Sequence, residues 1–206
     1  PSGSAKPSAA AACAPTGRGA RVQLFGDSTM VGWAVGGVPV DTPATMLQTE
    51  LDAAFGAGAA VVESRAVSST TALQLLDGTD GLNAPWPQSV AADVVVINHG
   101  INDRGHGASV EEYRARLERL AIAPAAVIFA TPNPTIGTDM APFAAAMRQV
   151  AARTGAGLAH TFALVQSIGL SGLSDWAHPT PALNRVIVQR SLLPAVSAGL
   201  RPLLCR

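Results

Sequence analysis

The stretch "ADVVVINHG", residues 92–100, decides the fold class. Its run 94–97 is apolar at every position, so both faces of the predicted strand are buried, which is typical of a parallel sheet. A parallel strand that is buried on both faces needs helices above and below it. The sequence on either side must therefore supply strands that alternate with helices.

That alternation runs along the chain. We expect further strands at residues 21–26, 59–64, 125–131 and 157–162, and helices at 43–55, 71–76, 109–120, 141–154 and 181–198. Thr42 and Ser109 are expected to cap two of these helices, and Pro194 to kink or split the last one. The pattern predicts an α/β fold, a three-layer α/β/α sandwich with a parallel sheet of about five strands.

The composition limits the classes of partner. The formal net charge is zero, with 14 basic and 14 acidic residues and no run of either sign. This balance argues against nucleic acid or an anionic membrane as the main partner. No apolar stretch reaches the roughly 18 residues of a membrane-spanning helix, so stable membrane insertion is not expected. We expect a monomer.

The start of the chain suggests export. Residues 1–19 are rich in Pro, Ala, Ser and Gly and predict a flexible segment, followed by a single folded domain over residues 20–206. Cys13 and Cys205 lie near opposite ends and can form a disulfide in an oxidising compartment, although two unrelated thiols are the alternative. We therefore expect a secreted or periplasmic protein.

Polar side chains follow the predicted strands, at the edge of the sheet where ligands bind in this class of fold. Each of the loops expected there carries hydroxyl, amide, carboxylate or imidazole groups, and they span residues 26–29, 64–70, 100–103, 131–134 and 175–179. Turn composition alone does not account for five such loops. The sequence therefore predicts a site at this edge.

Three of these side chains suit nucleophilic catalysis. A serine hydroxyl such as that of Ser28 is a weak nucleophile and needs an adjacent base. Histidine changes its charge near neutral pH, so His178 can accept the hydroxyl proton. Asp175, three residues earlier on the same loop, can hold the imidazole in the required tautomer.

The same residues carry a family resemblance. The blocks "GDST" (26–29), "GIND" (100–103) and "DWAHP" (175–179) resemble, in order and spacing, those of the SGNH hydrolases, also called the GDSL esterase/lipase superfamily. The resemblance covers residues 21–181 and implies a flavodoxin-like fold, ester hydrolysis without a cofactor and an SGNH hydrolase domain over residues 20–206. The spelling "GDSTM" also resembles the rhamnogalacturonan acetylesterase branch.

The second block departs from the family pattern. Where the family has an asparagine and a glycine, this chain has Ser64 and Ser69. The resemblance implies an oxyanion hole formed by the backbone N–H groups of Ser28 and Ser69 and the side-chain amide of Asn102. Ser69 still offers its N–H, but it lacks the freedom of glycine at positive φ and adds bulk that narrows the acyl pocket.

Further residues are expected to bind substrate, and all of them except Thr29 have plain alternatives. The expected set is Thr29, Met30, Trp33, Asn133 and Trp176. The apolar members can equally pack in the core, and "TPNP", which contains Asn133, is also an ordinary turn signal.

A metal site is the weaker interpretation of the segment after the strand at 92–100. His99, Asp103 and His106 are candidate ligands, but two glycines interrupt that stretch and no further His, Cys or Asp cluster supports them. We expect no metal and no cofactor.

These observations predict a serine esterase that forms an acyl-enzyme on Ser28. A short acyl group, acetyl above all, is the expected one, and a small molecule or a polysaccharide is its expected carrier. The alternatives are a lysophospholipase or thioesterase of the same superfamily, and a non-catalytic carbohydrate-binding module on the same scaffold, since fold does not fix function.

Overall fold

Five parallel strands form the central sheet of the computed structural model, which describes residues 19–205. They are β1 (Ala20–Gly26), β2 (Ala60–Ser64), β3 (Val94–Asn98), β4 (Ala126–Ala130) and β5 (Gly157–Ala159), in the order β2-β1-β3-β4-β5. All neighbours pair in parallel, with Leu24 opposite Val96 and Val96 opposite Ile128. The predicted parallel sheet is confirmed.

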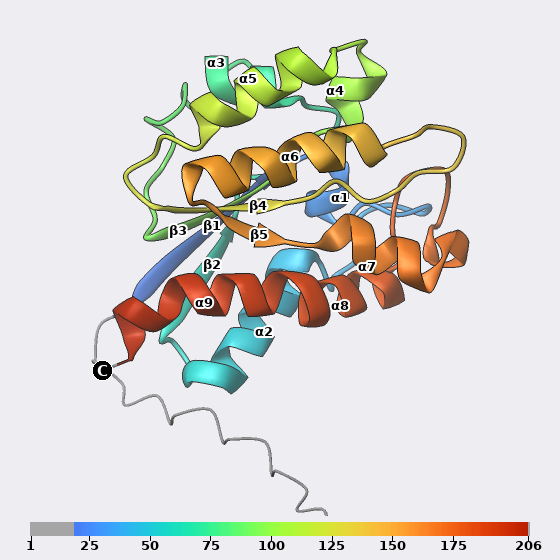
Figure 1. Cartoon of the computed structure of the whole chain (residues 1–206). Coiled ribbons are helices and arrows are strands. Elements are labelled where there is room, and N and C mark those ends of the chain that lie inside the picture. The colour runs from blue at the N-terminus through green and yellow to red at the C-terminus, as the bar shows by residue number, and fades with distance from the viewer. Residues whose placement is uncertain (1–18, 206) are drawn as a thin grey trace, which may run out of the picture.

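Helices cover both faces of the sheet, as Figure 1 shows. One layer contains α3 (Ala72–Asp77), α5 (Val110–Leu120) and α6 (Ala141–Thr154), and the other contains α2 (Pro43–Phe55), α8 (Pro181–Ile187) and α9 (Leu193–Leu204). Successive strand residues alternate between two buried clusters: Leu24 and Val96 face the α2 side, whereas Phe25 and Ile97 face the α5 side. The three-layer sandwich is therefore confirmed.

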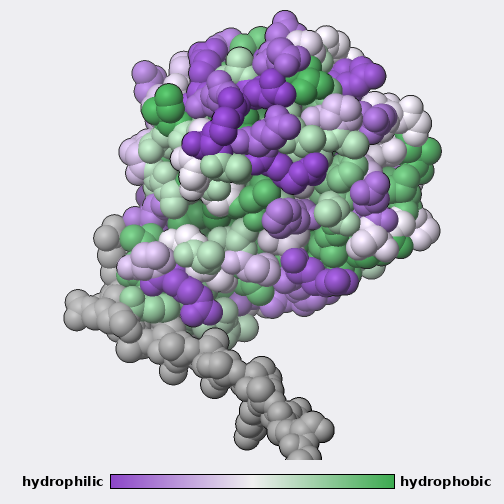
Figure 2. Space-filling model, viewed as in Figure 1, coloured by the Kyte–Doolittle hydropathy of each residue, from purple (hydrophilic) through white to green (hydrophobic). Residues whose placement is uncertain are grey.

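The helices begin where their sequences predict. The Thr42 hydroxyl accepts from the N–H of Thr45, with Pro43 in the first turn of α2. At α5, the Ser109 hydroxyl and the Glu112 carboxylate cap each other's backbone N–H groups. Figure 2 shows hydrophilic residues over the layer of α3, α5 and α6, as expected for the outer faces of amphipathic helices.

Two predicted elements were wrong in part. The strand expected at 157–162 ends at Ala159, and α7 (Thr161–Ile168) follows it. Phe162 and Val165 lie one helical turn apart and are both buried, so this segment packs as a helix. The helix expected at 181–198 continues to Leu204 through a π-helical segment (Val188–Leu192).

That π-helical segment has a local cause. Pro194 lies in the first turn of α9 and cannot donate a backbone hydrogen bond to the preceding turn, and the wider π turn lies directly before it. The chain passes through this region without a break in the helix. A short 3₁₀ helix (Leu170–Gly172) follows α7, and residues 173–180 then lead to α8.

Several predictions concern residues that the structure does not describe. The segment 1–18 and Cys13 lie outside the described residues, so the flexible segment at 1–19 and the pairing of Cys13 with Cys205 stay predictions. Within residues 19–205, no helix combines the length and the apolar character needed to span a bilayer.

Candidate active site

Ser28 lies at the carboxyl edge of the sheet because β1 turns directly into a short helix, α1 (Ser28–Val31). The Asp27 carboxylate caps this helix by accepting from the backbone N–H of Thr29 at 2.9 Å. A Cβ atom at Gly26 would lie 2.7 Å from that of Met30, so glycine is needed for α1 to fold this closely against β1. The tight turn presents the Ser28 hydroxyl beyond the sheet.

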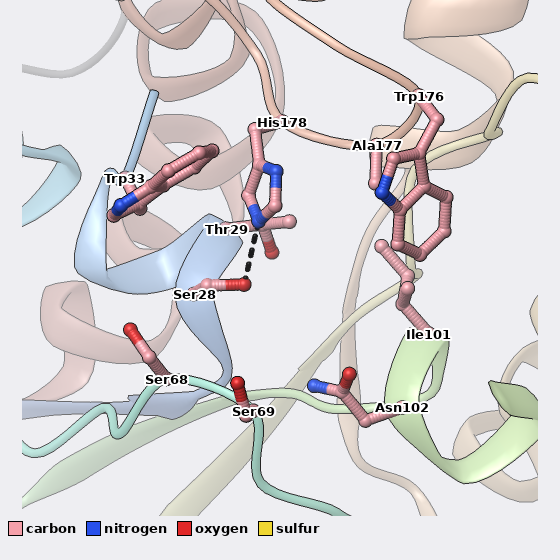
Figure 3. A pocket seen from close by; sticks show the side chains of 10 residues that line it. All are labelled: Ser28, Thr29, Trp33, Ser68, Ser69, Ile101, Asn102, Trp176, Ala177 and His178. Carbon is pink, nitrogen blue, oxygen red and sulfur yellow. Dashed lines mark hydrogen bonds between the residues drawn. The ribbon is translucent and has the colours of Figure 1, made fainter. Parts of the chain in front are cut away.

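His178 and Asp175 meet that hydroxyl in a line. The Ser28 Oγ atom lies 2.8 Å from His178 Nε2, and His178 Nδ1 lies 2.8 Å from Asp175 Oδ2 (Figure 3 shows the first contact). Ser28 is 150 residues from His178 in sequence, so only the folded chain brings them together. The arrangement allows a proton to pass from the hydroxyl to the imidazole.

Hydrogen bonds keep the Asp175 side chain ionised. Burial raises the pKa of its carboxyl, but the backbone N–H groups of Ala177 and His178 and the imidazole outweigh that effect, so the pKa lies below its ordinary value. Both N–H groups donate to Oδ1 at 2.8 Å. The carboxylate is therefore available to accept from His178 Nδ1.

The loop that carries these two residues is fixed from two sides. Ser174 closes it by donating its N–H to the His178 carbonyl at 2.7 Å. The buried amide of Asn133 donates to the Ala177 carbonyl at 2.9 Å. Because these bonds determine the path of the backbone, the imidazole is held where Ser28 can reach it.

A cavity of about 250 Å³ opens in front of Ser28. Figure 3 shows ten side chains that line it: Ser28, Thr29, Trp33, Ser68, Ser69, Ile101, Asn102, Trp176, Ala177 and His178. The Trp33 ring packs edge-on against the His178 imidazole, with 4.4 Å between ring centroids, and the corresponding distance for Trp176 is 6.4 Å. The cavity thus combines polar groups with two indole rings.

The loop after β2 and the short helix α4 (Ile101–Gly105) after β3 bring amide donors to this cavity. Ser69 has φ 63°, the left-handed region that favours glycine, and its side chain is exposed. The Asn102 amide donates one N–H to the Thr70 carbonyl at 3.0 Å. A carboxamide nitrogen has two protons, so the other stays available, and Figure 3 shows this nitrogen turned toward Ser69.

The structure brings together most of the predicted site residues, but two lie elsewhere. Thr29, Trp33 and Trp176 line the cavity with Ser28, Ser69, Asn102 and His178. Met30 is 4% exposed and packs in the core on the α2 side of the sheet. Asn133 is 2% exposed and supports the Ala177 backbone, so both side chains contribute to the site from behind it.

Sequence reasoning missed four residues near the cavity. Ser68, Ile101 and Ala177 line it directly, and Thr70 holds the Asn102 amide. All four adjoin predicted site residues in sequence and lie within the predicted site loops at 64–70, 100–103 and 175–179, and that position is the signal that could have identified them.

The candidate metal ligands do not converge. Asp103 is fully buried and forms an ion pair with Arg116 at 2.8 Å, and its other oxygen accepts from the N–H of Ala72. His99 is buried under the site, whereas His106 is exposed on the surface. Within the described part of the chain, no three His, Cys, Asp or Glu side chains are grouped so that they could hold a metal ion.

The fold and the site together define a class of protein: a three-layer α/β/α sandwich with serine, histidine and aspartate in line at the carboxyl edge of a parallel sheet. The model of the GDSL-like lipase/acylhydrolase family matches residues 24–186. The chain belongs to this family and is a serine carboxylic ester hydrolase. The narrower resemblance to rhamnogalacturonan acetylesterases stays a prediction.

Solved structures share this fold at low sequence identity. An acetyl xylan esterase from Geobacillus stearothermophilus aligns with a TM-score of 0.70 and 22% identity, over 87% of this chain and 95% of that one. A lipase/acylhydrolase from Enterococcus faecalis aligns with a TM-score of 0.70 and 17% identity, over 90% and 97% respectively. A search of curated proteins found no match.

Proposed function

We propose that this chain is an esterase that removes short acyl groups, acetyl above all, from a carbohydrate through an acyl-enzyme on Ser28. One observation carries the catalytic part of the proposal. The Ser28 hydroxyl, the His178 imidazole and the Asp175 carboxylate are linked by contacts of 2.8 Å at the mouth of one cavity.

The first half of the reaction acylates the serine. The Ser28 oxygen attacks the carbonyl carbon of the ester while its proton moves to His178 Nε2. Asp175 accepts a hydrogen bond from Nδ1 and stabilises the imidazolium that forms. When the tetrahedral intermediate collapses, the bond from carbon to the alcohol oxygen breaks and His178 returns the proton to the departing alkoxide.

Amide donors stabilise the negative charge on the carbonyl oxygen. We assign this role to the backbone N–H groups of Ser28 and Ser69 and to the second N–H of Asn102. Removal of one such donor lowers kcat by about 10²–10³-fold in other serine hydrolases.

The second half of the reaction releases the acid. Water takes the place of the alcohol and loses a proton to His178 as it attacks the acyl carbon. The bond from that carbon to the Ser28 oxygen then breaks, and the serine recovers its proton from the imidazole. The products are a free carboxylic acid, acetic acid in the preferred case, and the deacylated alcohol, so the cycle needs no cofactor.

Three observations support acetyl as the acyl group and a carbohydrate as its carrier. The cavity of about 250 Å³ is small for a substrate site, and Ser69 adds a side chain where the family has glycine. The exposed Trp176 indole at its rim offers an apolar face of the kind on which a sugar ring can stack. The related solved structures include acetyl xylan esterases.

The location of the protein is a separate proposal. We propose a secreted or periplasmic enzyme in which Cys13 and Cys205 form a disulfide. Mass spectrometry of the peptides from a non-reducing digest should recover the two cysteines as one linked species, and two separate thiols would contradict this proposal.

Replacement of the nucleophile tests the catalytic proposal. Ser28→Ala should abolish turnover of p-nitrophenyl acetate and labelling by a fluorophosphonate probe, while the circular dichroism spectrum stays unchanged. Ser167→Ala, which removes an exposed hydroxyl on α7, is the matched control and should keep both. Full turnover in the Ser28→Ala enzyme would contradict the proposal, and an unreactive native enzyme would favour a binding module.

A substrate series tests the acyl group and its carrier. Among p-nitrophenyl esters from C2 to C12, kcat/KM should be highest for C2, and acetylated xylo-oligosaccharides should release acetate. Highest turnover at C8 or longer would contradict the short acyl group. Hydrolysis of lysophosphatidylcholine or acetyl-CoA in preference to the acetylated sugar would instead favour the lysophospholipase or thioesterase alternative.

A further inference from the structure

A buried histidine lies behind the site and takes no part in the chemistry described above. Gly26 of β1 pairs with Asn98 of β3, so the residues that follow them, Asp27 and His99, lie next to each other at the carboxyl edge of the sheet. Both side chains are 1% exposed. The imidazole is thus placed between the strand that leads to Ser28 and the loops that carry the amide donors.

The hydrogen bonds of Thr70 fix the direction in which His99 donates. The Thr70 hydroxyl gives its own proton to the Val67 carbonyl at 2.7 Å. Its oxygen also lies 3.3 Å from His99 Nε2, so it can only accept there, and Nε2 must carry the proton. Burial lowers the pKa of His99 despite the neighbouring Asp27 carboxylate, which favours this neutral, singly protonated ring.

Packing alone gives little reason for an imidazole at this position. Within the described residues, His99 Nδ1 has no hydrogen-bond partner although it is buried, and the same holds for Asp27 Oδ2. An unpaired buried polar atom destabilises the folded state, and an apolar ring of similar size would avoid that loss. The feature that an apolar ring cannot supply is the Nε2–H bond to Thr70.

Thr70 is the residue through which this bond reaches the donors. Its carbonyl accepts from the Asn102 amide at 3.0 Å, and its backbone follows Ser69, whose φ of 63° is strained for a residue with a side chain. Such a conformation persists only where its surroundings hold it. Thr70 is 4% exposed and is held through both its hydroxyl and its carbonyl.

We propose that His99 is a positioning residue for the oxyanion donors, acting through Thr70 on the Ser69 N–H and the Asn102 amide. The proposal rests on the function proposed above. His99 touches neither the substrate nor the reacting atoms, so its effect is on the alignment of donors that act in the transition state. Loss of its N–H should therefore lower kcat and change KM little.

Two substitutions at His99 separate this role from packing. His99→Leu removes the N–H, whereas His99→Gln retains an amide N–H that can reach Thr70. With p-nitrophenyl acetate, His99→Leu should lower kcat by about 10–100-fold, less than the full loss of a donor, and keep KM within about twofold. His99→Gln should recover most of kcat. His160→Gln, at an exposed histidine before α7, is the control and should behave as wild type.

A second measurement reports on the oxyanion donors directly. A short alkyl boronic acid adds to the serine oxygen and forms a tetrahedral adduct that mimics the intermediate. His99→Leu should weaken its binding by the same factor by which kcat falls. Thr70→Val, which removes the accepting oxygen, should reproduce both effects, and the double variant should be no worse than either single variant.

The outcomes distinguish this proposal from the proposed function. Wild-type kcat in His99→Leu, together with an inactive Ser28→Ala, would overturn the positioning role and leave the esterase intact. A loss of kcat that His99→Gln does not restore, or that leaves boronate binding unchanged, would make His99 a packing residue. If His99→Leu fails to fold, wild-type kcat in Thr70→Val overturns the proposal. Activity in Ser28→Ala would instead contradict the proposed function.

Discussion

Ser69 offers the sharpest test of how the second loop is built. Its φ of 63° places a residue with a side chain in the left-handed region, which costs roughly 1–2 kcal/mol relative to glycine. Ser69→Gly removes this strain but adds freedom to the unfolded chain, worth about 0.4–1 kcal/mol in the opposite direction. We therefore expect the free energy of unfolding to rise by about 0.5–1 kcal/mol.

Thermal and urea unfolding measure this change. For a domain of this size, the expected gain corresponds to a rise in Tm of about 1–4 °C. Ser68→Gly is the matched control. Among the described non-glycine residues only Ser69 has a positive φ, so Ser68 carries no strain of this kind. With no strain to relieve, Ser68→Gly should lower the free energy of unfolding by about 0.4–1 kcal/mol.

The Ser69→Gly substitution also tests the acyl pocket. Ser69→Gly removes a side chain that lines the cavity, so longer acyl groups should fit better. The ratio of kcat/KM for p-nitrophenyl butyrate to that for the acetate should rise by about tenfold. An unchanged ratio together with a lower Tm would refute both the strain argument and the assignment of Ser69 to the pocket wall.

Four further predictions concern the site and its supports. Arg116→Leu leaves the Asp103 carboxylate buried without its ion pair and should lower the free energy of unfolding, measured in urea, by about 3–5 kcal/mol. Asp175→Asn should lower kcat by about 10³–10⁴-fold with Ser28 in place, and fluorophosphonate labelling should slow in parallel. The pKa of Asp175 lies below its ordinary value, so its carboxylate stabilises the fold above about pH 3.9, and this contribution is lost as the pH falls further. The difference in the free energy of unfolding between wild type and Asp175→Asn should therefore be full at pH 7 and smaller at pH 3. Trp176→Ala should raise KM for acetylated xylo-oligosaccharides more than for p-nitrophenyl acetate, which steady-state kinetics on the two substrates would show.

The fold was predictable where the signals are local. The run 94–97 is apolar on both faces, and Thr42 and Ser109 cap their helices within three residues. The helix α7 was not predicted because its start carries no side-chain cap. Instead, the Phe162 N–H donates to the Thr131 hydroxyl, 31 residues away in sequence, and such a contact cannot be recognised from a local pattern.

The site residues also divide into those that a local sequence signal identifies and those that it does not. Ser28, Asp175 and His178 follow from loop position and spacing, because parallel strands bring their carboxyl ends to one edge. The positions of Met30 and Asn133 could not be deduced. Met30 is buried by the close approach of α1 to β1, and Asn133 by its bond to a carbonyl 44 residues away. Both depend on distant backbone segments that the sequence does not relate to each other.

The direction of the strands also separates the cavity from the ends of the described chain. Figure 1 shows α9 ending near the start of β1, whereas Ser28 follows the opposite end of that strand. Ala20 is thus roughly 25 Å along the strand from the nucleophile. A resin or carrier protein coupled near Ala20 or Leu204 would leave the cavity facing outward. In this orientation the cavity of the immobilised enzyme would face a bulky, insoluble polymer.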